Sequence, residues 1–135
     1  MENIKDENLI NSDPLVLAYI GDAVFELYVR EHVIRSGQVK PNKLHATAVG
    51  YVRASAQAVA IKELFDELPE DQQRLVKRAR NHKSLSKPKN ADPVEYKWAT
   101  AFEALVGYLH LAGLKEEMDD VISKSIAIIE TVTKR

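Results

Sequence analysis

Apolar residues recur along this chain at the three- and four-residue spacing of helices, and we find no stretch with the two-residue alternation of a half-buried strand. Prolines and glycines divide this pattern into segments, each of which predicts one helix. We expect helices over residues 14–36, 41–68 (with a break near its end), 69–80, 93–112 and 115–133, and a polar loop over 81–91. The fold class predicted is therefore all-α, with short connections around one core.

Two Asp-Pro pairs mark helix starts with particular clarity. Asp13-Pro14 and Asp92-Pro93 each place an N-cap side chain before a proline at the first helical position. We therefore expect one domain over 1–135, with its core in 13–134 and a flexible N-terminal segment at 1–12.

Composition narrows the class of protein. The chain has 135 residues, 45% hydrophobic and 29% charged, which is typical of a globular domain. It has no cysteine, which excludes disulfides, thiolate zinc sites and thiol nucleophiles and suits a reducing compartment. The longest uncharged run in its apolar helices, residues 104–114, is too short for a membrane span of roughly 20 residues. With no apolar run near the N-terminus to act as a signal peptide, we expect a cytoplasmic protein that does not enter membranes.

Charge is distributed unevenly along the chain. Residues 72–90 contain seven basic and no acidic residues, whereas the other 116 residues contain 12 basic and 20 acidic ones. A local positive segment on an acidic protein predicts a surface that binds anions. A solvated helix face followed by a loop would produce the same pattern, and the segment alone does not distinguish the two.

Two acidic residues, Asp22 and Glu103, lie inside apolar helical stretches, where a carboxylate costs several kcal/mol unless it is compensated. Small residues flank both, and Gly21 and Gly107 each lower helix propensity by about 1 kcal/mol against alanine. Close approach of the two helix backbones would explain these glycines and bring the acids together. Glu26 lies one turn after Asp22 on the same face. A shared site with only oxygen ligands indicates magnesium or manganese; pairing with arginine or exposure at the helix edge is the alternative.

Two short motifs carry a resemblance to a known family. Residues 19–24 (Tyr-Ile-Gly-Asp-Ala-Val) resemble the signature helix of ribonuclease III enzymes, and residues 103–107 (Glu-Ala-Leu-Val-Gly) resemble the second acidic motif of that family. The order and the separation of about 80 residues also fit. Residues 14–24 and 87–92 further resemble the bacterial Mini-III branch, which consists of the catalytic domain without a separate double-stranded-RNA-binding domain.

The resemblance implies a function in some detail. Members of this family are all-helical homodimers that cleave double-stranded RNA with a divalent metal, leaving 5′-phosphate and 3′-hydroxyl ends. It implies Asp22 and Glu103 as catalytic residues and metal ligands, and Mg²⁺ as the cofactor with Mn²⁺ able to substitute. From its position one turn after Asp22, we expect Glu26 to contribute through water. The resemblance also implies Tyr19 at the dimer interface. The substrate implied is precursor large-subunit (23S) ribosomal RNA, and no nucleotide cofactor is expected.

The chain departs from full-length ribonuclease III at two positions. Those enzymes have acidic residues four before the aspartate and three before the glutamate, where this chain has Ala18 and Thr100. With two of four acids absent, tight binding of two metal ions by protein groups is in doubt.

An RNA-cleaving domain without an accessory domain must bind the duplex itself. The basic segment is suited to contact phosphates and 2′-hydroxyls of an A-form helix. The RNA-binding residues predicted there are Arg74, Lys77, Arg78, Asn81, Lys83, Ser84, Lys87, Lys89 and Asn90.

Two other classes of function remain open from the sequence. One is a catalytically inactive relative that binds RNA or assists ribosome assembly, as the loss of two acids would suggest. The other is a helical adaptor whose acids are structural. A magnesium-dependent cleavage assay separates the first from an enzyme, and salt-sensitive RNA affinity separates the second.

Overall fold

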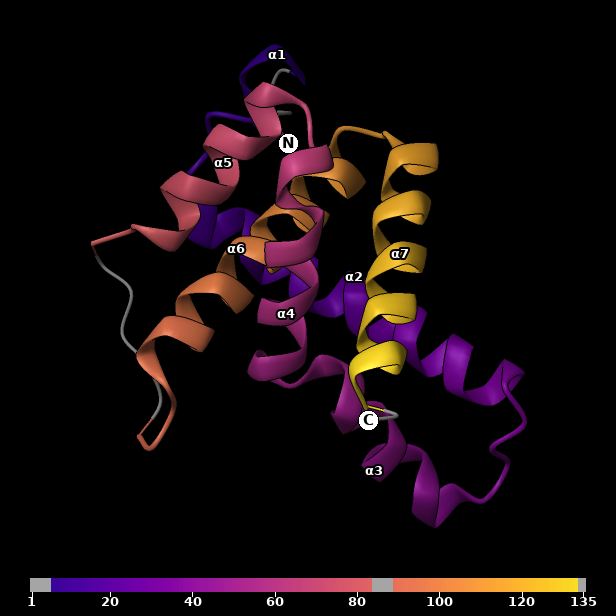
Figure 1. The fold of residues 1–135 in the computed structure, drawn as a ribbon. Coiled ribbons are helices and arrows are strands. Elements are labelled where there is room, and N and C mark those ends of the chain that lie inside the picture. The colour runs from indigo at the N-terminus through magenta and orange to yellow at the C-terminus, as the bar shows by residue number, and fades with distance from the viewer. Residues whose placement is uncertain (1–5, 84–88, 134–135) are drawn as a thin grey trace.

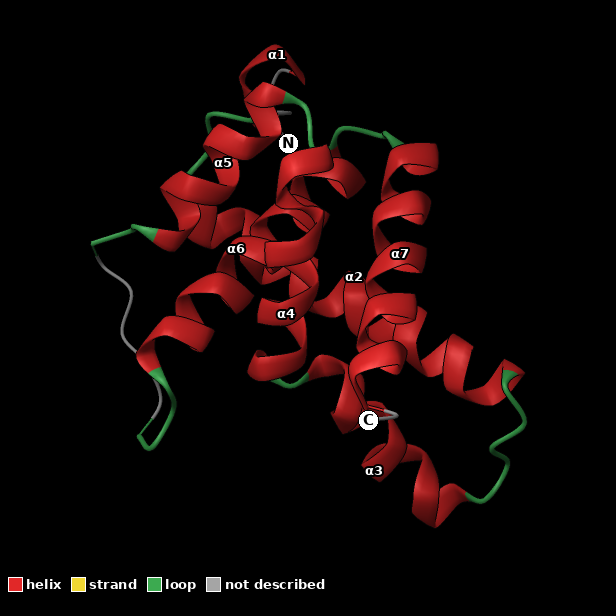
Figure 2. Ribbon diagram, viewed as in Figure 1, coloured by secondary structure: helices red, strands yellow, loops and turns green. Residues whose placement is uncertain are grey.

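The computed structural model describes residues 6–83 and 89–133, and within these ranges it contains helices and no strand (Figure 2). The all-α prediction is thereby confirmed. The helices are α1 (Asp6–Leu9), α2 (Pro14–Arg35), α3 (Pro41–Val52), α4 (Ala54–Leu64), the 3₁₀ turn η1 (Phe65–Glu67), α5 (Glu70–Arg80), α6 (Pro93–Leu111) and α7 (Lys115–Thr133).

Helix α6 is the central element of the fold and packs against α2, α4, α5 and α7 (Figure 1). This position requires apolar side chains around most of its circumference, which its sequence provides: Phe102, Leu105 and Leu109 are fully buried. The ring of Phe102 meets that of Phe25 from α2 edge-on, with 4.8 Å between centroids. The α2–α6 pair therefore forms the middle of the core.

The predicted helix starts at the Asp-Pro pairs are confirmed. The Asp13 side chain accepts a hydrogen bond from the backbone N–H of Leu15 (2.9 Å) at the start of α2. Asp92 accepts from the N–H groups of Val94 (2.9 Å) and Glu95 (3.1 Å) at the start of α6. These caps satisfy N–H groups that no helix can pair internally and set where both central helices begin.

The predicted helix over 41–68 does change near its end, where α4 gives way to the 3₁₀ turn η1, but the prediction missed a second break. The chain leaves the helical conformation in the middle, at Arg53, whose ψ of 152° is extended. Helix α3 packs against α2, whereas α4 packs against α6 and α7, so the two halves must point in different directions. Gln57 closes the break by donating from Nε2 to the Val52 carbonyl oxygen (2.8 Å).

The N-terminal segment 1–12, expected to be flexible, contains α1 and buries Leu9. Arg78 of α5 holds the connection to α2 by donating to the carbonyl oxygens of Ile10 (2.6 Å) and Ser12 (3.3 Å). None of the helices described here has the length and hydropathy needed to cross a membrane.

Candidate active site

The two acidic motifs meet where α2 crosses α6. A Cβ atom added to Gly21 would lie 2.7 Å from the backbone carbon of Glu103, and one added to Gly107 would lie 2.8 Å from that of Leu17. Such distances are well inside ordinary contact, so both positions accept only glycine without movement of the backbones. The predicted close approach of the two helices is therefore confirmed, and it is reciprocal.

This crossing places Asp22 and Glu103 on the wall of one pocket of about 570 Å³. The pocket is lined entirely by α2 and α6, with the exposed Asp22 on one helix and the half-buried Glu103 on the other. The two side chains are close enough for the Asp22 carboxylate to raise the pKa of Glu103. Of the alternatives, no ion pair with arginine is formed by either acid among the described residues, whereas Asp22 does reach solvent at the edge of its helix.

Proximity of the two carboxylates has an electrostatic consequence. The pKa of Glu103 is raised from its usual 4.5 to about 8, first by burial and then by the negative charge and hydrogen bonding of Asp22, while the nearby Gln57 amide acts in the opposite direction. A carboxylic acid that holds its proton near neutral pH is typical of a site built for another positive charge.

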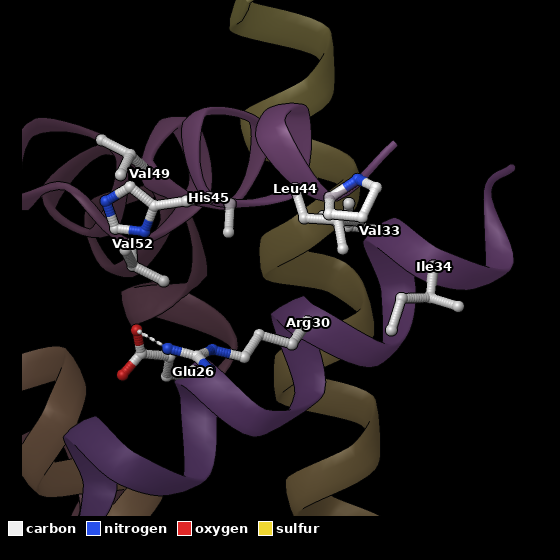
Figure 3. Close-up of a pocket in the computed structure, with 10 residues that line it drawn as sticks. Glu26, Arg30, Val33, Ile34, Leu44, His45, Val49 and Val52 are labelled. Atoms are coloured by element: carbon white, nitrogen blue, oxygen red, sulfur yellow. Dashed lines mark hydrogen bonds and ion pairs between the residues drawn. The ribbon is translucent and has the colours of Figure 1, made fainter. Parts of the chain in front are cut away.

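Glu26, the third acid expected to contribute, lines the same pocket but is already paired. Its Oε1 accepts from Nη2 of Arg30 at 3.1 Å, and this pair borders a second pocket of about 320 Å³ between α2 and α3 (Figure 3). Across the ranges 6–83 and 89–133, no three histidine or acidic side chains gather in a metal-ligating group. The site therefore offers a metal ion two carboxylates directly, those of Asp22 and Glu103.

The positions that are acidic in full-length relatives also line the pocket. Ala18 and Thr100 face it from α2 and α6. The Thr100 hydroxyl donates to the Tyr96 carbonyl oxygen at 3.0 Å, one turn back in its own helix. Neither residue supplies a charge.

The donor set fits a divalent cation that keeps most of its water. Asp22 and Glu103 supply carboxylate oxygens, and Oε1 of the buried Gln57 has no hydrogen-bond partner in the described part of the chain. Magnesium prefers oxygen ligands and is commonly held by one or two carboxylates with several waters retained. The residues present suit such an ion, held by Asp22 and Glu103.

Gln57 is a site residue that the sequence analysis missed. It belongs to α4, which packs against α6, and its side chain hydrogen-bonds Glu103. The signal was present: Gln57 occupies the same helix face as Ile61 and Leu64, which are both buried. A single amide on an apolar face requires polar partners inside the fold.

The predicted RNA-binding residues fall into three groups. Arg74, Lys83, Lys89 and Asn90 are exposed, and Asn90 has a positive φ of 71°. Ser84 and Lys87 lie outside the described residues.

The remaining three are exposed but already have protein partners. Arg78 is engaged by backbone carbonyls ahead of α2. The ammonium of Lys77 lies 5.5 Å from the ring centre of Phe65. Asn81 accepts from Arg80 Nε at 3.1 Å. Of the described candidates, Arg74 within α5 and Lys83 and Lys89 of the following loop are therefore the exposed cations best suited to contact a phosphate backbone.

Tyr19 is 85% exposed and lies at the edge of the pocket. It belongs to a stripe on α2 that the rest of this chain leaves uncovered, with Val16, Leu27 and Ile34 each more than half exposed. Four large apolar side chains along one exposed helix face exceed the scattered exposure of an ordinary monomer surface.

Comparison with known proteins shows which family the chain belongs to. Residues 15–114 match the model of the Ribonuclease III domain. The chain is 50% identical over 129 residues to Mini-ribonuclease 3 of Brevibacillus brevis, covering 96% of this chain and 95% of that protein. It is 46% identical over 123 residues to Mini-ribonuclease 3 of Symbiobacterium thermophilum, covering 91% and 95%.

A solved structure agrees with these relatives. The crystal structure of protein FN1578 from Fusobacterium nucleatum superposes with a TM-score of 0.78 at 30% identity, covering 89% of this chain and 96% of that one. The matched region contains both acidic motifs and the helices that bring them together. The chain therefore belongs to the ribonuclease III family and, within it, to the Mini-ribonuclease 3 endoribonucleases.

Proposed function

We propose that this endoribonuclease hydrolyses double-stranded RNA with a divalent cation held by Asp22 and Glu103. Mg²⁺ is the proposed ion, with Mn²⁺ able to substitute, and the products are 5′-phosphate and 3′-hydroxyl ends. The observation that carries the proposal is the meeting of these two carboxylates in one pocket at a glycine-mediated helix crossing. Ribonuclease III enzymes as a family act with divalent metal, which supports the same reading.

The chemistry divides between the ion and the chain. A divalent cation, when bound, activates water for attack on a phosphodiester and neutralises charge that develops on the phosphate. Glu103 must release its proton to bind the ion, and Asp22 offers its carboxylate from the exposed side of the pocket. The rigid α2–α6 crossing holds both groups in place before RNA arrives, so little reorganisation is needed at the moment of reaction.

The surrounding surface supports an RNA duplex as the substrate. The exposed Arg74 of α5 and the exposed cations of the loop that follows would contact phosphates, which makes affinity depend on salt. Lys83 and Lys89 are the strongest described candidates because they are exposed and follow the helix in which three other basic residues are engaged. We propose precursor 23S ribosomal RNA as the cellular substrate and the cytoplasm as the location, both on the family resemblance.

We further propose that the enzyme acts as a homodimer with Tyr19 at its interface. The exposed apolar stripe of α2 supports this, because a second copy of the chain would remove Tyr19 and its neighbours from water. Two active sites related by a twofold axis would then face the two strands of one duplex.

A cleavage assay on a plain RNA duplex tests the function. With Mg²⁺ we expect cuts that EDTA abolishes, and we expect Asp22→Asn and Glu103→Gln each to reduce kcat at least 100-fold with RNA affinity retained. Glu63→Gln, an exposed acid on α4 away from the pocket, is the matched control and should leave kcat unchanged.

The same assay decides the other candidate function, a catalytically inactive RNA-binding or ribosome-assembly protein. Ala18 and Thr100 in place of acids, and the pairing of Glu26 with Arg30, favour that candidate. RNA binding without cleavage at saturating Mg²⁺ and Mn²⁺ would establish it and remove the proposal of hydrolysis.

A further inference from the structure

Gln57 is a deeply buried amide next to the carboxylate pair. Its side chain is 2% exposed, in a helix whose other buried residues are apolar. Burying an amide costs free energy unless its polar atoms find partners, so its retention at this position needs a reason.

The amide has two partners, on different elements. Nε2 donates to the Val52 carbonyl oxygen (2.8 Å), which belongs to the last turn of α3. It also lies close enough to Glu103 on α6 to lower the pKa of that carboxyl. One side chain of α4 thus joins the break between α3 and α4 to the acidic residue of the second motif.

The first partner has a structural explanation, and the second points to the site. A helix end leaves carbonyl groups unpaired, and capping Val52 satisfies one of them. A donor to Glu103 has a different effect, because it limits the directions in which a half-buried carboxylate can point. The other polar atom of the amide, Oε1, is buried and has no partner among the residues described. A purely structural cap would require neither the donor to Glu103 nor a free acceptor beside it.

We propose that Gln57 is a positioning residue of this enzyme, which holds the Glu103 carboxylate toward Asp22 in the orientation that binds the divalent ion. The inference rests on the proposed function, because it assigns Gln57 a purpose only if Asp22 and Glu103 hold a metal. Side chains that hydrogen-bond metal ligands typically change metal affinity or activity 10–100-fold when they are replaced.

The test compares Gln57→Leu with Gln72→Leu. Gln72 of α5 is the matched control because it is also a buried glutamine, 5% exposed, whose amide reaches Glu117 rather than the pocket. Mn²⁺ binding is measured by titration calorimetry without RNA, thermal unfolding is measured for each variant, and kcat and KM are measured on an RNA duplex.

Gln57→Leu is expected to weaken Mn²⁺ binding about 10-fold or more and to lower kcat with little change in KM. Gln72→Leu is expected to bind Mn²⁺ within about twofold of the unmodified protein, whatever its loss of Tm, which separates positioning from a general loss of stability. A folded Gln57→Leu that binds Mn²⁺ as tightly as Gln72→Leu would overturn the proposal and leave the cleavage function intact.

A second measurement uses only the unmodified protein, so its outcome does not depend on whether a variant folds. In the unmodified protein, the side-chain ¹⁵N–¹H resonances of Gln57 should shift on titration with Mg²⁺ and saturate with the dissociation constant found by calorimetry. Unmoved resonances at saturating Mg²⁺ would overturn the assignment of Gln57. An unmodified protein that neither binds Mn²⁺ nor cleaves RNA would instead overturn the proposed function, and this inference with it.

Discussion

Replacing Gly21 by alanine would put a methyl group into the crossing that assembles the active site. The added Cβ would lie 2.7 Å from the Glu103 backbone carbon and 2.8 Å from the Gly107 backbone nitrogen, where ordinary contacts begin at 3.4 Å. All these neighbours are backbone atoms of a central helix, so no flexible side chain can move aside. Helices α2 and α6 would have to separate by about 1 Å, a displacement that can cost about 100-fold in rate when it moves catalytic groups.

The stability change combines two opposing effects. Overpacking a tight core costs roughly 1–3 kcal/mol. Alanine regains about 1 kcal/mol over glycine within a helix. We expect a net loss of about 0–2 kcal/mol in the free energy of unfolding, or a Tm lower by up to about 10 °C for a chain of this size.

Gly50→Ala is the matched control, because a Cβ at this helical position in α3 would meet nothing within 4 Å. It should raise stability by about 0.5–1 kcal/mol and leave cleavage unchanged. Urea unfolding and single-turnover cleavage of an RNA duplex measure the two effects. A Gly21→Ala variant as stable and as active as Gly50→Ala would show that the two helices can separate freely, and would refute the role of the crossing in holding the acids together.

Three further predictions follow from the site and its surface. The pKa of Glu103 is about 8 in the folded protein and near 4.5 in the unfolded chain, so the Tm of the metal-free protein should fall as pH rises from about 5 to 8. Glu103→Gln should reduce this dependence of Tm on pH. An equal dependence in the variant would argue against the raised pKa. The double variant Lys83→Gln and Lys89→Gln should reduce the slope of log affinity for duplex RNA against log salt concentration by about 1–2. Lys124→Gln on α7 should leave that slope unchanged. A double variant with the slope of the unmodified protein would mean that the loop does not contact phosphates. Tyr19→Glu should shift sedimentation from dimer to monomer at micromolar protein, and a variant that stays dimeric would place the interface elsewhere.

Much of the fold could be predicted from the sequence because the residues that begin and end helices act on backbone groups a few positions away. The caps at Asp13 and Asp92 depend on side chains that bond N–H groups two or three residues away, so both helix starts could be located without tertiary information. The close approach of two helices was also predictable, since a glycine within a buried helix is costly unless another backbone needs its space. Gly21 and Gly107 do have backbone against them.

The break at Arg53 and the partners of individual charges could not be predicted in this way. The helical pattern continues past Arg53, and only the different packing partners of α3 and α4 require the chain to turn there. Glu26 lies on the same helix face as Asp22, but its carboxylate forms an ion pair with Arg30, one turn further along α2. Arg78 has the spacing of an RNA-binding stripe, yet backbone carbonyls 66 and 68 residues away engage it.

The sequence by itself determined the starts of α2 and α6, their close approach and the pair of acids that they carry, because a cap bonds N–H groups a few residues away and a glycine in a buried helix is costly unless another backbone needs its space. The tertiary structure alone decided which polar groups surround those acids. Gln57 reaches Glu103 from a helix 46 positions earlier in the chain, and no spacing rule relates the two. Such contacts depend on how whole helices pack, since burial leaves each polar side chain to find whichever partner the neighbouring helices bring within reach.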